Sequence, residues 1–138
     1  PQGIPLFKPP FSRITAIDMN TGEHAWVIPT GETPARVQEV IDENNLDIPN
    51  TGTGALVPMV VTPSMLVYSD TKTDGTPMLY AVDKSTGETV GSIEVPDRSR
   101  YGMSSWTHDG HQYIMLQTGS KLTAVALPAA KPAETGYH

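Results

Sequence analysis

The chain has 138 residues and a mass of 14.9 kDa, which is enough for one ordinary domain and too little for two. Its 12 glycines and 13 prolines cut it into short segments, which excludes a long-helix bundle or a coiled coil and favours turn-rich β structure. A net charge of −6, with no cluster of Lys and Arg, excludes a nucleic-acid partner, and the absence of cysteine excludes disulfides and thiolate sites.

The given residues predict neither a membrane span nor a signal peptide. No apolar run approaches the roughly 20 residues of a membrane span. The first three residues, Pro1-Gln2-Gly3, do not form a signal peptide and lack an initiating methionine. We therefore expect a processed product or an excised piece of a longer protein.

The first third of the chain predicts a hairpin followed by a helix. After a proline-rich opening, the apolar runs 14–17 and 25–28 flank a turn at 18–23 that contains Asn, Thr and Gly. A short surface helix is expected near 34–43, with Thr33 as its N-cap and Pro34 at its first position. Residues 47–54 then form a loop.

From residue 55 onward, β signals follow one another closely. Apolar runs at 56–62, 65–69, 78–82 and 89–95 predict a four-stranded antiparallel meander, with a polar loop at 70–77. Three further runs, at 102–107, 111–117 and 122–127, predict a three-stranded sheet whose first two strands join at an Asp-Gly turn. Residues 129–138 are expected to form a flexible C-terminal tail.

An internal repeat relates the two turns. Ala16-Ile17-Asp18 and Thr21-Gly22-Glu23 recur as Ala81-Val82-Asp83 and Thr86-Gly87-Glu88, offset by 65 positions. Repetition of a β-hairpin unit indicates a propeller or another radial array. The aspartates are expected to bind loop amides, and Trp26 is expected to cover the joint between neighbouring units. In the second copy Gly91 stands at the position of this tryptophan.

The repeat and the sequence around it resemble a known family. The pattern Ala-x-Asp-x-x-Thr-Gly-x-x-x-Trp is similar to the repeat of the pyrroloquinoline quinone (PQQ) dehydrogenase propellers. The segments at 3–18, 81–96, 109–114 and 124–128 are similar, in order, to the late part of the membrane-type, glucose/quinate-like branch of that family.

This resemblance implies an all-β fold made of about two to two and a half four-stranded antiparallel blades of a β-propeller. Residues 1–128 would form the partial propeller. PQQ and Ca²⁺ would lie on the propeller axis of the parent enzyme, held mostly by earlier blades, and neither is expected to bind tightly to this chain alone. Among the residues present, Asp74 is the expected cofactor-binding residue; no catalytic residue and no metal ligand can be matched.

Other candidate sites have simpler interpretations. The loop at 70–75 lacks the ligands of an EF-hand, because Lys72 holds position three and Ala81 holds position twelve. His108 and His111 flank a turn without a third ligand and are expected to be exposed. Asp18 and Asp83 are interpreted as turn caps rather than as a glycosidase pair.

The resemblance implies that the parent oxidises alcohol or sugar hydroxyls in the periplasm and that the isolated chain is inactive. Two alternatives remain open: a non-catalytic propeller-type interaction or scaffold module, and a carbohydrate-binding β domain with Trp26 and Trp106 exposed. The expected partners are the remaining propeller blades or a second copy of the chain. Membrane contact is expected only through parts of the parent that are not present here.

Overall fold

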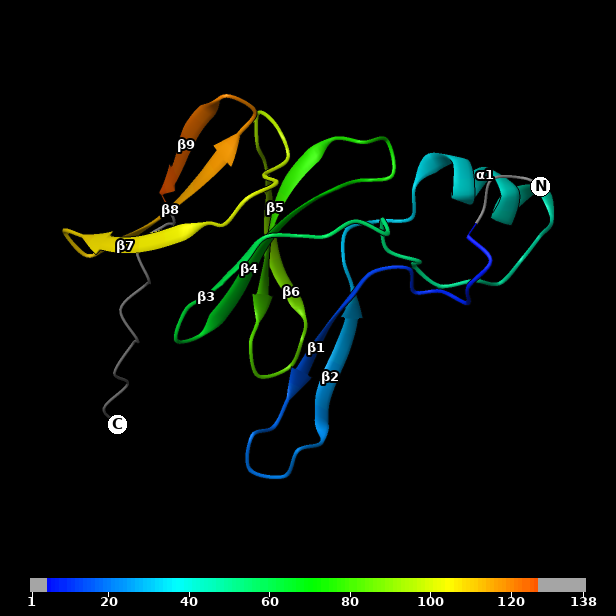
Figure 1. Ribbon diagram of the computed structural model, residues 1–138, viewed down its shortest axis with the longest axis horizontal. Coiled ribbons are helices and arrows are strands. Elements are labelled where there is room, and N and C mark those ends of the chain that lie inside the picture. Colours follow the sequence, from blue (N-terminus) through cyan, green and yellow to red (C-terminus); the bar gives the residue numbers. More distant parts are fainter. Residues whose placement is uncertain (1–4, 127–138) are drawn as a thin grey trace, which may run out of the picture.

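The computed structural model describes residues 5–126, which form three antiparallel sheets and one short helix (Figure 1). The first sheet pairs β1 (Arg13–Ile17) with β2 (His24–Pro29). The second has the order β3 (Met59–Val61), β4 (Met65–Thr71), β5 (Pro77–Asp83), β6 (Thr89–Glu94). The third has the order β7 (Ser104–His108), β8 (His111–Thr118), β9 (Lys121–Ala126). The expected all-β architecture of two, four and three strands is therefore confirmed.

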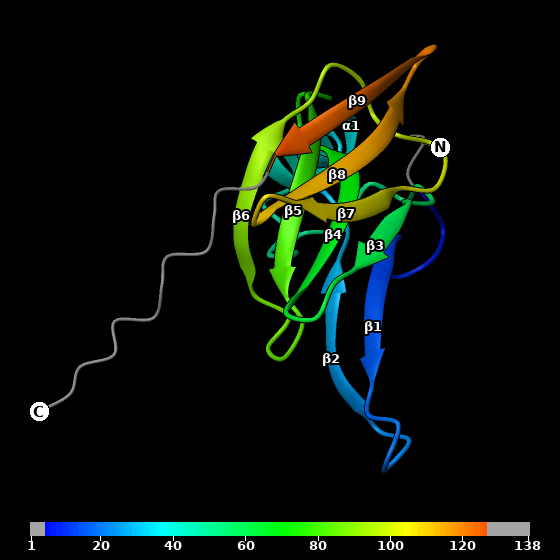
Figure 2. The same cartoon turned by 90° about the vertical axis from the view of Figure 1, so that its left-hand side faces the viewer.

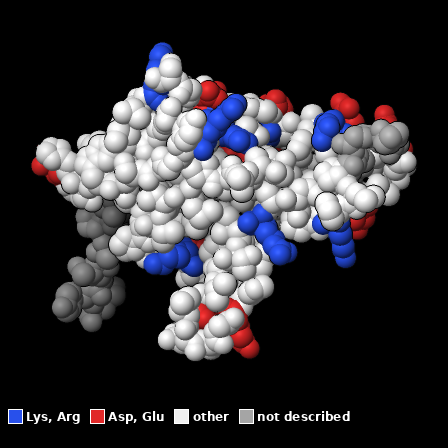
Figure 3. Space-filling view, viewed as in Figure 1, with Lys and Arg blue, Asp and Glu red and all other residues white. Residues whose placement is uncertain are grey.

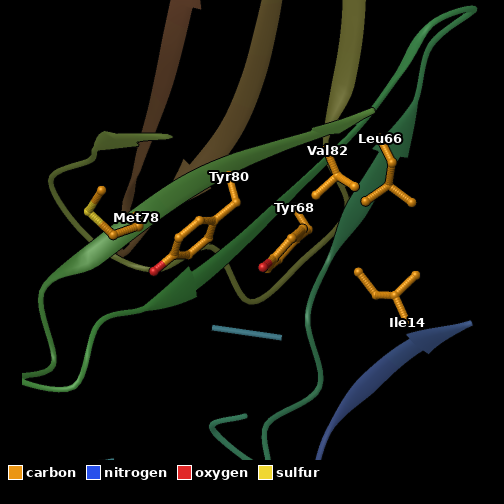
Figure 4. Packing of buried hydrophobic residues seen from close by; sticks show 6 residues of the cluster. All are labelled: Ile14, Leu66, Tyr68, Met78, Tyr80 and Val82. Atoms are coloured by element: carbon orange, nitrogen blue, oxygen red, sulfur yellow. The ribbon is translucent and has the colours of Figure 1, made fainter. Parts of the chain in front are cut away.

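The second sheet lies in the middle, and its two central strands, β4 and β5, are buried on both faces. Leu66 and Tyr68 of β4 point into one apolar core with Ile14 of β1, and Trp26 and Ile28 of β2 pack against this core (Figure 4). The alternate residue Val67 points into the other core, together with Ile114 and Leu116 of β8. Burial on both faces explains why β4 is a continuous apolar run instead of an alternating one.

The hairpin of β1 and β2 extends beyond the end of the middle sheet in both views (Figures 1 and 2). These strands pair only with each other among residues 5–126, and they pack on the face of the middle sheet opposite to β8. Residues 14–28 therefore do not add a strand to the last sheet. That sheet has three strands, and β9 is at its edge.

Helix α1 (Ala35–Glu43) occupies the expected place and buries Val37 and Ile41. The prediction of Thr33 as its N-cap is wrong, because Pro34 holds the cap position with extended backbone angles and the helix begins at Ala35. The Thr33 hydroxyl instead accepts the N–H of Thr51 at 3.0 Å. Within the part of the chain described here, no helix is long and apolar enough to cross a membrane.

Two strand boundaries differ from those that the sequence predicts. The run at 56–62 gives only the three residues of β3, and Leu56 is 95% exposed. The predicted loop at 70–77 is shorter, because β4 continues through Asp70 to Thr71 and β5 begins at Pro77. The strand continues because Asp70 pairs opposite Met78 and its buried side chain accepts hydrogen bonds from the Thr53 hydroxyl. The proposed tail at 129–138 lies outside the described residues.

The two repeat turns have the same hydrogen-bond pattern. In the first, Oδ1 of Asp18 accepts the N–H of Asn20 at 2.8 Å, and its carbonyl accepts the N–H of Gly22 at 2.7 Å. In the second, Asp83 makes the equivalent bonds to Ser85 at 2.7 Å and Gly87 at 2.9 Å. The interpretation of both aspartates as turn caps is therefore confirmed.

Trp26 joins the first sheet to the second, as the repeat predicts. Its indole N–H donates to the carbonyl oxygen of Lys84 at 3.0 Å, and its ring lies directly over Gly87. A Cβ on Gly87 would be 2.8 Å from the Trp26 ring, and the φ of Gly87 is +81°. Only glycine therefore allows this contact.

Candidate functional site

Four segments of the chain meet at the end of the middle sheet where β4 finishes and β5 begins. We call this region the loop rim and define it as residues 30–33, 50–53, 70–76 and 97–101. Backbone hydrogen bonds join Glu32 to Thr71 at 3.1 Å and Thr53 to Thr30 at 3.0 Å. The loop between β4 and β5 therefore lies beside the segment that leads from β2 to α1, as Figure 1 shows.

Asp70 is the charged residue at the centre of the loop rim, and its side chain is fully buried. The Thr53 hydroxyl donates to its two carboxylate oxygens at 2.8 and 3.0 Å, and the N–H of Thr71 donates to Oδ1 at 2.9 Å. The Arg98 guanidinium lies 3.7 Å from the same oxygen. Asp70 thus connects three segments of the rim that are distant in sequence.

Burial raises the pKa of Asp70 above its ordinary value, although the Thr53 hydroxyl, the Thr71 N–H and Arg98 act in the opposite direction. The carboxylate is enclosed by these partners and has no exposed surface. It is therefore suited to holding Arg98 in place and not to removing a proton from a substrate.

Gly31 allows the segments of the loop rim to approach one another. Its φ is +64°, and a Cβ there would lie 2.8 Å from Cγ of Asp70 and 2.9 Å from the carbonyl oxygen of Thr71. Any other residue would both strain the backbone and push the buried carboxylate away.

A pair of stacked tyrosines lies under the loop rim. The rings of Tyr68 and Tyr80 are 5.1 Å apart and nearly parallel, and their hydroxyls point to the same side (Figure 4). The Tyr68 hydroxyl accepts the N–H of Gly31 at 3.4 Å, whereas the buried Tyr80 hydroxyl has no hydrogen-bond partner among the described residues. Burial raises the pKa of both hydroxyls, so both are neutral donors at physiological pH.

Asp74, the residue expected to lie near the cofactor, is in the exposed loop between β4 and β5. Its Oδ1 accepts the N–H of Thr76 at 2.9 Å, and this hydrogen bond lowers the pKa of the carboxyl group. The structure places Asp74 at the same end of the sheet as Asp70 but does not bring the two carboxylates into one hydrogen-bonded cluster.

The remaining candidates lie away from the loop rim. His108 and His111 are exposed at the ends of β7 and β8 that flank the turn, as expected. Trp106 is 41% exposed and stacks on Tyr113 with ring centroids 5.3 Å apart. Between residues 5 and 126, no three His, Asp or Glu side chains are grouped closely enough to hold a metal ion together.

Sequence reasoning missed Asp70, Gly31 and Arg98. It assigned Asp70 to a loop because Ser69 and Asp70 end the apolar run. The matching lengths of the paired strands could have revealed Asp70. A strand that pairs with residues 77–83 needs seven residues, so it must include Asp70 and Thr71.

Comparison with known proteins identifies the family. Residues 1–114 match the family described as "PQQ: Glucose/ethanol/alcohol dehydrogenase, beta-propeller domain". The chain is also similar to the glycerol dehydrogenase large subunits of Gluconobacter thailandicus and of Gluconobacter oxydans (strain 621H), with 29% identity over 121 residues in each case. The aligned segment covers 85% of this chain but only 15% of each relative. No solved structure matches.

The family match covers most of the chain and includes both repeat turns and the Trp26 joint. The three sheets of two, four and three antiparallel strands agree with it. The chain therefore belongs to the PQQ family of glucose/ethanol/alcohol dehydrogenase β-propeller domains.

Proposed function

We propose that this chain is the late part of the propeller of a PQQ-dependent dehydrogenase that oxidises alcohol or sugar hydroxyls. The observation that carries the proposal is the contact of Trp26 with Gly87, which joins two repeat units side by side as neighbouring blades. The relatives are named for a dehydrogenase of glycerol, itself a compound with hydroxyl groups, and this supports the substrate class.

The parent enzyme in this proposal belongs to the membrane-type, glucose/quinate-like branch and acts in the periplasm. The ordered similarity of residues 3–128 to the late part of that branch supports the assignment. The remaining blades are the partners of this chain in the parent, and in their absence a second copy covers the open sheet faces. Asp74 is the residue of this chain that lies nearest to PQQ in the assembled propeller.

The isolated chain is catalytically inactive in this proposal. The support is that no three acidic or histidine side chains are grouped within residues 5–126 and that the buried carboxylate of Asp70 is enclosed by Thr53 and Thr71. Titration of the chain with PQQ in the presence of Ca²⁺ is expected to give no saturable spectral change, and a dye-linked assay with glycerol or glucose no turnover. Saturable binding at micromolar PQQ would contradict this part of the proposal.

A chimera tests the assignment to a dehydrogenase. The matching 121-residue segment of the Gluconobacter glycerol dehydrogenase large subunit is replaced by this chain. If the chain is a late propeller segment, the chimera binds PQQ and oxidises glycerol, and a second chimera with Trp26→Ala loses both in proportion to its lower stability. A folded chimera that binds no PQQ would favour the alternative, a scaffold module.

A further inference from the structure

A polar hollow lies next to the loop rim, on the side of the third sheet. Its volume is about 280 Å³, and it opens between the connection from β6 to β7 and the turn from β8 to β9. Its lining residues are polar or glycine: Asp97, Arg98, Arg100, Tyr101, Gln117 and Gly119. None of them was singled out by the sequence as a binding residue.

The segment that carries the two arginines, residues 97–101, is fixed to β4 by an ion pair and by hydrogen bonds. Arg98 is only 27% exposed, and its guanidinium lies 3.7 Å from the fully buried carboxylate of Asp70. The N–H of Ser99 donates to Oγ of Ser69 in β4 at 3.1 Å, and the Ser99 hydroxyl donates to the carbonyl oxygen of Tyr101 at 3.2 Å. These bonds fix the segment before any ligand arrives, which lowers the entropic cost of binding.

The opposite wall is the turn between β8 and β9. Gln117 donates from its side-chain amide to the carbonyl oxygen of Gly119 at 3.0 Å, which stabilises the turn. Gly119 has a φ of +59°, and a Cβ there would lie 3.2 Å from Oδ2 of Asp97. The two sides of the hollow therefore lie close together at Gly119 and Asp97.

The lining chemistry favours an anion. Two arginines and the Tyr101 hydroxyl supply N–H and O–H donors, and Arg presents donors in a planar fork that matches carboxylate and phosphate oxygens. The one acidic residue of the lining, Asp97, already accepts the backbone N–H of Arg98 at 2.7 Å. Figure 3 shows basic side chains on this part of the surface, over the connection between β6 and β7, with acidic side chains beside them.

We propose that this hollow binds the oxyanion group of a small molecule, either a carboxylate or a phosphate, through Arg98 and Arg100. The proposal goes beyond the dehydrogenase assignment and does not depend on it, because binding is measured on this chain itself. Failure of the site would leave the PQQ and chimera experiments unaffected.

The test is a titration of the 138-residue chain with inorganic phosphate and, separately, with citrate, at constant ionic strength. Amide NMR shifts are followed, with NaCl and uncharged glycerol as controls. Saturable shifts confined to residues 97–101 and 117–120 are expected, with a Kd on the order of 1 mM for the preferred anion. The ratio of the phosphate and citrate affinities distinguishes a phosphate ligand from a carboxylate ligand.

Three variants give the proposal its sharpest test. Arg100→Gln, at an exposed position, is expected to weaken binding about tenfold, and Asp97→Asn to strengthen it, because a repelling charge is removed. Arg36→Gln changes an exposed arginine of α1 and is the matched control, with no expected effect. Any of three results would overturn the proposal: NaCl causes the same NMR shifts as phosphate or citrate, neither anion saturates the shifts, or the Arg100→Gln variant binds as well as the unaltered chain.

Discussion

Replacing Gly87 by alanine tests the joint between the first and second sheets, and the repeat itself supplies the control. Gly22 and Gly87 occupy equivalent turns with φ values of +76° and +81°. A Cβ on Gly22 would meet nothing within 4 Å, whereas a Cβ on Gly87 would be 2.8 Å from the Trp26 ring. The two substitutions therefore share the backbone strain and differ only in the contact with Trp26.

The backbone strain of an alanine at positive φ costs about 1–2 kcal/mol, so Gly22→Ala is expected to lower the free energy of unfolding by that amount. In Gly87→Ala the ring of Trp26 must also move away, which adds about 1–3 kcal/mol, the usual cost of overpacking. The stability of a domain is only about 5–15 kcal/mol in total, so the difference between the two variants is measurable.

The cost of removing the ring follows from its contacts. Trp26 is partly buried, and about 120 Å² of covered apolar surface at about 25 cal/mol per Å² gives ~3 kcal/mol. The indole hydrogen bond to Lys84 adds about 1 kcal/mol, so Trp26→Ala is expected to destabilise by about 3–4 kcal/mol.

Urea denaturation of the two single glycine variants, of Trp26→Ala and of the double variant Trp26→Ala/Gly87→Ala measures these terms. In the Trp26→Ala background, Gly87→Ala is expected to cost no more than Gly22→Ala does in the unaltered chain. Equal costs for Gly22→Ala and Gly87→Ala in the unaltered chain would refute the role of Trp26 as the joint.

Three further predictions follow from other parts of the structure. Carboxyl NMR titration is expected to show Asp70 titrating above its ordinary pKa, so its stabilising contribution is complete at low pH and is lost as the pH rises through its folded-state pKa. The hydrogen bonds from Ser85 lower the pKa of Asp83, so the contribution of Asp83 is lost as the pH falls. A pKa of Asp83 above that of Asp70 would contradict the structure. Gly91→Trp is expected to stabilise the chain by about 1–2 kcal/mol. Gly91 pairs opposite Ala81 as Trp26 pairs opposite Ala16, and Gly91 borders an apolar hollow of about 360 Å³ that the ring could fill. A lower urea midpoint for this variant would contradict the prediction. Light scattering is expected to show self-association that Leu122→Lys in β9 reduces, because β9 is an edge strand and Leu122 is 72% exposed; a strict monomer at high concentration would rule it out.

Much of the fold could be predicted from local sequence signals. The turns around Asp18 and Asp83 were predicted correctly because each is closed by hydrogen bonds within six consecutive residues. The number of strands followed from apolar runs separated by Gly, Pro, Asn and Asp. The contact of Trp26 with the next unit was also correct, but only because the repeat placed an equivalent turn 65 residues further on.

The candidate site was much less predictable, because its contacts join residues that are far apart in the sequence. Asp70 looks like the first residue of a polar loop, and only the packing of Thr53 and Arg98 against it makes it a buried strand residue. Thr33 is a residue type that favours N-caps, but its hydroxyl accepts a hydrogen bond from the Thr51 N–H instead. Tryptophan is a residue type often found in cores, yet Trp106 is 41% exposed and stacks on Tyr113 across β7 and β8.

The sequence by itself therefore determined the all-β class, the two equivalent turns and the family, since each depends on short-range hydrogen bonding or on the order of motifs along the chain. Only the tertiary structure decided which polar residues are enclosed. Gly31, Asp70 and Arg98 acquire their roles because the segments after β2, at the end of β4 and after β6 converge, and the pairing of a buried carboxylate depends on that convergence.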